Sequence, residues 1–129
     1  MVALMAELAG FTAQAVTTLL IDVVLMAITN VLIFSIWYWI MDPPGIGEMP
    51  RADERWDFLF PQRAGESPQF EGWRPRYADY LFLAFTTTFA FSPTDSAPLT
   101  IRAKLAMIVQ TIISAITIIV LVGNAINVL

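Results

Sequence analysis

The residues best suited to chemistry lie in a short polar segment between two long apolar runs. Thr86, Thr87 and Thr88 end a short, aromatic-rich apolar stretch, and a turn-rich segment with Asp95 follows. Residues 75–88 are too few to cross a membrane, and Pro75 suits the first turn of a helix. The carbonyl end of such a helix carries partial negative charge, which favours cations. The chemistry that we expect here is therefore cation binding.

A second set of polar side chains recurs along the last apolar run. Their spacings of 4, 3 and 7 residues put them on one face of a helix, and the set is Gln110, Ser114, Thr117 and Asn124. They either line a water-filled cavity or form hydrogen bonds between helices. Both interpretations imply packing against other helices.

Asp22 is the one charged residue in the first apolar run, residues 11–41. An acid inside a membrane span is often functional, which makes Asp22 a candidate ion or proton site. Alternatively, it lies near the far membrane interface, or it bonds to Thr18 or to another helix.

Composition excludes several classes of function. The chain has neither histidine nor cysteine and a net charge of -4, which argues against redox chemistry and nucleic-acid binding. It offers no nucleophile–base pair, so we expect no enzyme, no cofactor and no metal site. The acids of the polar stretch 42–79 invite a metal, but we favour a solvated acidic loop that concentrates cations.

The fold class that we predict is an all-α membrane protein with two transmembrane helices. The chain is 57% hydrophobic and 14% charged, far from the average of soluble proteins. We expect four segments: residues 1–41 form an N-terminal stretch and an outer span, 42–74 a polar cap, 75–99 a re-entrant helix and loop, and 100–129 an inner span. Trp37, Tyr38 and Trp39 suggest an aromatic belt. Residues 1–10 either begin the first helix or lie along the interface.

The order of these segments resembles the pore domain of tetrameric potassium-type cation channels. In that family a pore helix ends in threonines, and a filter strand reads Thr-Val-Gly-Tyr-Gly-Asp. Here the aligned residues are Thr88, Phe89, Ala90, Phe91 and Ser92, with Asp95 displaced by two positions. The resemblance implies a homotetramer in which residues 86–92 and Asp95 meet permeant inorganic ions. Residues 91–100 also look like uncharacterised bacterial integral membrane proteins, which implies a bacterial plasma membrane.

Ala90 and Ser92 stand where the family has its filter glycines. A side chain in the left-handed conformation costs about 1–2 kcal/mol, so a filter of the usual shape is disfavoured. We therefore expect a cation pore of weak or atypical selectivity, or a non-conducting membrane scaffold that keeps the pore-loop fold. Ser92 and Asp95 also fit a helix-capping pattern.

The basic residues predict one membrane orientation and the resemblance predicts the other. All seven lie on the side of the polar loop, which by the positive-inside rule would be cytoplasmic. The channel resemblance instead puts this loop outside, and we favour that orientation. Polar residues within both spans also predict self-association in the lipid bilayer.

Overall fold

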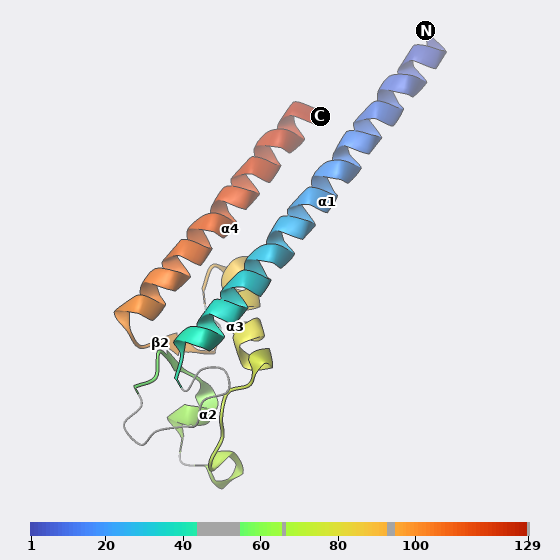
Figure 1. Ribbon diagram of the computed structural model, residues 1–129. Helices are drawn as coiled ribbons and strands as arrows, with labels where there is room; N and C mark the ends of the chain where they lie inside the picture. Colours follow the sequence, from blue (N-terminus) through green and yellow to red (C-terminus); the bar gives the residue numbers. More distant parts are fainter. Residues whose placement is uncertain (44–54, 66, 93–94, 129) are drawn as a thin grey trace.

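The computed structural model describes residues 1–43, 55–65, 67–92 and 95–128. Its elements in chain order are α1 (Val2–Met41), β1 (Phe58–Leu59), α2 (Pro61–Ala64), the 3-10 turn η1 (Pro68–Phe70), α3 (Tyr77–Ala90), β2 (Ala97–Pro98) and α4 (Ile101–Val128). Figure 1 shows α1 and α4 as two long helices with both chain termini at the end away from the loops. The prediction of a mainly helical chain with two long apolar helices is confirmed.

The helices α1 and α4 are both long and apolar enough to cross a membrane. Most of their large apolar side chains are exposed in the single chain, unlike those of a core helix in a soluble protein. α1 has 40 residues, or about 60 Å at the usual rise, which is twice the thickness of a hydrocarbon core. Residues 2–10 continue this helix and do not form a separate segment.

The packed core lies at the loop end of the molecule. Strands β1 and β2 pair antiparallel there, with Phe58 opposite Pro98 and Leu59 opposite Ala97. Aromatic rings join the loop to the helices: Tyr38 of α1 lies edge-on to Phe58 at 5.1 Å between ring centroids. Tyr38 is fully buried, so the aromatic belt predicted at residues 37–39 is wrong for this residue, whereas the neighbouring Trp37 is exposed.

Helix α3 lies against the loop-side half of α1 (Figure 1). It begins and ends two residues later than predicted, so Phe89 and Ala90 are helical, and Phe91 takes the left-handed conformation at φ 56°. The backbone of residues 88–90 is therefore not the extended strand of a channel filter. Threonine, phenylalanine and alanine continue the helix because no glycine interrupts it. The chain then returns to the loop end, where Ala97 and Pro98 form β2.

Helix α4 begins as predicted. The Thr100 hydroxyl accepts a hydrogen bond from the backbone N–H of Ala103 at 3.2 Å, which is the bond of an N-terminal cap.

Candidate functional site

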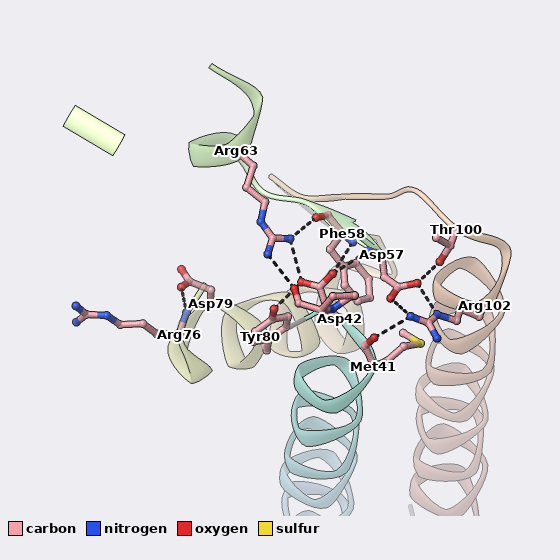
Figure 2. Close-up of polar contacts among 11 residues, drawn as sticks. Met41, Asp42, Asp57, Phe58, Arg63, Arg76, Asp79, Tyr80, Thr100 and Arg102 are labelled. Atoms are coloured by element: carbon pink, nitrogen blue, oxygen red, sulfur yellow. Dashed lines mark hydrogen bonds and ion pairs between the residues drawn. The ribbon is translucent and has the colours of Figure 1, made fainter. Parts of the chain in front are cut away.

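A buried carboxylate closes the end of α1. Asp42 lies just beyond the helix, with no exposed surface. Its Oδ1 accepts the backbone N–H groups of Asp57 at 2.8 Å and Phe58 at 3.3 Å. Its Oδ2 accepts Arg63 Nη1 at 3.0 Å and the Tyr80 hydroxyl at 2.5 Å (Figure 2). Four donors from the loop and from α3 therefore meet one carboxylate.

A second buried carboxylate, that of Asp57, holds the start of α4. It accepts Arg102 Nε at 2.7 Å and also the Thr100 hydroxyl. Arg102 Nη2 donates to the other oxygen of Asp57 and to the Met41 carbonyl at 2.9 Å (Figure 2). Asp57 thus ties the loop to the first turn of α4 and to the last residue of α1.

Together these side chains form the loop clamp, defined here as Asp42, Asp57, Arg63, Tyr80, Thr100 and Arg102. The two acids and two arginines balance in charge. The Arg63 side chain is only 5% exposed, whereas that of Arg102 is 60% exposed. Loss of Asp42 would therefore leave a buried Arg63 charge, whereas loss of Asp57 would leave an Arg102 charge that water already reaches.

The loop clamp also fixes the state of Tyr80. Burial, with the adjacent Asp42 carboxylate, raises the pKa of the Tyr80 phenol well above its usual value. The phenol therefore stays protonated and donates to Asp42.

Sequence reasoning missed the loop clamp. The sequence predicts that the acids of residues 42–79 belong to a solvated loop, and this prediction is wrong for Asp42 and Asp57 because both are fully buried. The place of Asp57 between Trp56 and Phe58 was the available signal, because an acid among large aromatic residues is often drawn into a core. Residues 44–54 and 66 of this stretch lie outside the described part of the chain.

A second polar network joins the three helices deeper in the structure. Gln110 of α4 has no exposed surface. Its Oε1 accepts the Tyr38 hydroxyl of α1, and its Nε2 donates to the Ala84 carbonyl and to the Thr88 hydroxyl oxygen of α3, each at 2.9 Å. One amide thus has all its principal hydrogen-bonding groups satisfied by two other helices.

The same network continues one turn further along α4. Ser114 donates to the Gln110 carbonyl at 2.9 Å and accepts from Asn30 Nδ2 at 3.0 Å. Of the two interpretations of Gln110 and Ser114, the structure gives the interhelical one, because both side chains are enclosed by other helices of the same chain. Thr117 bonds to the Ile113 carbonyl of its own helix at 2.8 Å.

The three threonines at the end of α3 are all buried but have different partners. Thr86 and Thr87 both donate to the Leu83 carbonyl, at 3.1 and 2.8 Å. Thr88 instead accepts from Gln110. Only the third threonine is therefore held by another helix.

The described side chains that directly follow the three threonines are exposed. Phe89, Ala90, Phe91, Ser92 and Asp95 are all exposed in the single chain. The Asp95 carboxylate accepts the Ser96 hydroxyl at 3.1 Å. Pro93 and Thr94 lie outside the described residues, so the capping pattern predicted from Ser92 stays a prediction.

Asp22, about halfway along α1, and Asn124, near the C-terminal end of α4, lie beside the same groove. Both line an open groove of about 490 Å³ between α1 and α4, with Gln14, Thr18 and Asn127. Asp22 is exposed. It lies 20 residues before Asp42, or about 30 Å along the helix, which is close to the thickness of a hydrocarbon core. This position fits the interpretation of Asp22 as an acid near the far interface.

The chemistry of these groups is electrostatic and structural. Within the described residues, no three or more acidic, histidine or cysteine side chains gather in a way that would hold a metal ion. Searches of protein-family models, curated proteins and solved structures found nothing that matches this chain.

Proposed function

We propose that the chain is the subunit of a homotetrameric, channel-like membrane pore, with residues 86–92 near the axis. The observation that carries this proposal is the short helix α3. It begins at the loop end of the molecule, and the chain that follows it is back at the loop end by β2. α3 has 14 residues, or about 21 Å. Its first turns meet the loop clamp through Tyr80, and the following chain rejoins the loop as β2.

The depth of this helix supports a re-entrant arrangement. Thr88 bonds to Gln110, which lies nine residues into α4, or about 14 Å from its start. That is about half of a hydrocarbon core of about 30 Å. In the proposed arrangement, the left-handed turn at Phe91 would lie near mid-membrane. Irregular backbone at this depth is tolerated only inside protein or beside water, because lipid satisfies none of its polar groups.

The turn after α3 is exposed in a single chain, which supports the presence of further subunits that would cover it. Phe91 and Ser92 are uncovered by the rest of the chain, although lipid is an unsuitable cover. Four copies around an axis would cover the turn with protein on its sides and with water in the centre. The carbonyl ends of four α3 helices would then face the axis and favour cations.

A second candidate function is a non-conducting scaffold or assembly subunit in the membrane. Two observations favour it: residues 88–90 are helical where a filter would be extended, and Gln110 and Ser114 are enclosed within the chain. A pore built this way has fewer polar groups to offer a moving ion than one lined by backbone carbonyls.

Cation flux separates the two candidates. The purified protein is reconstituted into liposomes loaded with a cation-sensitive dye, and its oligomeric state is measured in the same preparation. The pore requires flux that scales with the number of tetramers per vesicle. Well-folded oligomers that pass no monovalent or divalent cation would reject conduction and leave the scaffold.

The location that we propose is the bacterial plasma membrane.

A further inference from the structure

Gln110 is the residue through which α4 reaches the end of α3. Its amide nitrogen donates to both the Ala84 carbonyl and the Thr88 hydroxyl oxygen, at 2.9 Å each. Thr88 is the last of the three threonines, three residues before the left-handed turn at Phe91. Among the described residues, the two preceding threonines bond to a carbonyl of their own helix. Thr88 is therefore the hydroxyl whose position depends on another helix.

Tyr38 fixes the other side of the same amide. Its hydroxyl donates to Gln110 Oε1, so the amide nitrogen is turned towards α3. Tyr38 is itself fully buried and rests on Phe58 of the loop. The amide is thus held between α1 and α3, and a movement of α4 pulls on Thr88.

We propose that Gln110 is a positioning residue, which sets the Thr88 hydroxyl and the turn after it and thereby couples α4 to the segment that faces the ions. This inference rests on the proposed function, because the consequence for ions requires a pore. The coupling within the chain is testable without one.

The test uses cysteine accessibility, for which the chain supplies a clean background since it has no cysteine. A single cysteine replaces Ser92, and its labelling by a water-soluble thiol reagent is timed in the reconstituted oligomer. Loss of the Gln110–Thr88 bond should raise the labelling rate roughly two- to tenfold, the range that corresponds to the net loss of one hydrogen bond. Gln110→Leu, which also removes the bonds to Tyr38 and Ala84, should raise it by at least this much. Thr88→Val, which removes the acceptor but keeps the shape, should raise it similarly. The double variant should label little faster than Gln110→Leu alone, because that change already breaks the bond between Gln110 and Thr88.

Ser114→Ala is the matched control. Ser114 lies one turn along the same face of α4 and bonds to Asn30, with no bond to α3. The Ser114→Ala variant should be less stable, but its cysteine at position 92 should be labelled at an unchanged rate. Equal changes in the labelling rate from Ser114→Ala and Gln110→Leu would overturn the proposal, because Gln110 would then act only through general packing. Additive changes in the labelling rate from Thr88→Val and Gln110→Leu would also overturn it.

Ion flux supplies the second readout and separates the two hypotheses. In a conducting protein, Gln110→Leu should shift the ratio of potassium to sodium permeability and Ser114→Ala should not. Absence of flux from the wild-type oligomer would reject the pore, while the labelling result would still decide whether Gln110 positions the turn. An unchanged permeability ratio in a conducting protein would reject the role of Gln110 towards ions.

Discussion

Asp42→Asn removes one charge from the loop clamp while it keeps the size of the side chain. The carbonyl of asparagine can still accept the backbone N–H groups of Asp57 and Phe58. The new amide nitrogen, however, replaces the oxygen that accepts from Arg63 and Tyr80. Two donors then face a third donor, and the Arg63 guanidinium is left without its counter-ion.

The expected loss of unfolding free energy is about 3–5 kcal/mol, the usual result of removing one partner from a buried ion pair. Burial of Arg63 sets this value, because its side chain is only 5% exposed. Arg63 still donates to the Phe58 carbonyl at 2.9 Å and to the Pro43 carbonyl at 3.4 Å, and these bonds limit the loss. Arg63→Met should cost a similar amount, since it leaves the Asp42 carboxylate unpaired.

Asp79→Asn is the matched control. Asp79 is the third residue of α3, and near the surface its carboxylate accepts the Arg76 backbone N–H at 2.7 Å. Asparagine keeps a carbonyl oxygen that can accept the same bond. The control should lose less than about 1 kcal/mol. Unfolding in detergent can be followed by the fluorescence of the four tryptophans, of which Trp56 lies 4.7 Å from the Arg63 guanidinium.

Two results would refute this reasoning. One is a loss for Asp42→Asn no larger than that of the Asp79 control. The other is a double variant, Asp42→Asn with Arg63→Met, that loses the full sum of the single changes, because removal of both charges should leave no unpaired ion.

Three predictions concern the proposed pore. Cysteines at Ser92 should cross-link into ladders that reach four chains, and a ceiling at two chains would contradict the tetramer. Reversal potentials in mixed salts should show weak preference between potassium and sodium, because Ala90 and Ser92 replace filter glycines, so a strong preference would contradict it. Asp95→Asn should lower cation flux at unchanged oligomer stability, whereas the same type of change at the exposed loop acid Glu71 should have little effect; equal flux changes would reject a special role of Asp95.

The long helices could be predicted from sequence because their signal is local. Apolar runs of sufficient length mark α1 and α4, and α4 begins within one residue of the predicted start of the inner span. α3 was placed within two residues for the same reason. The resemblance to a glycine-containing filter predicts that this helix ends at Thr88, whereas the helix propensity of the residues present carries it through Ala90.

The polar contacts could not be predicted because their partners lie far apart in the chain. Asp42 and Tyr80 are separated by 38 residues, and Asp57 and Arg102 by 45. Periodicity locates a face of a helix but does not say which helix covers it, so Gln110 fitted a cavity and an interhelical contact equally well. Only the packing of α1, α3 and α4 decides between them.

A density map of the purified oligomer in lipid nanodiscs tests the central claim most directly. We predict four copies around one axis, with the turn after α3 facing that axis near mid-membrane and density for ions beside it. The claim would be contradicted by fewer than four copies, or by four copies whose α3 turns face away from the axis.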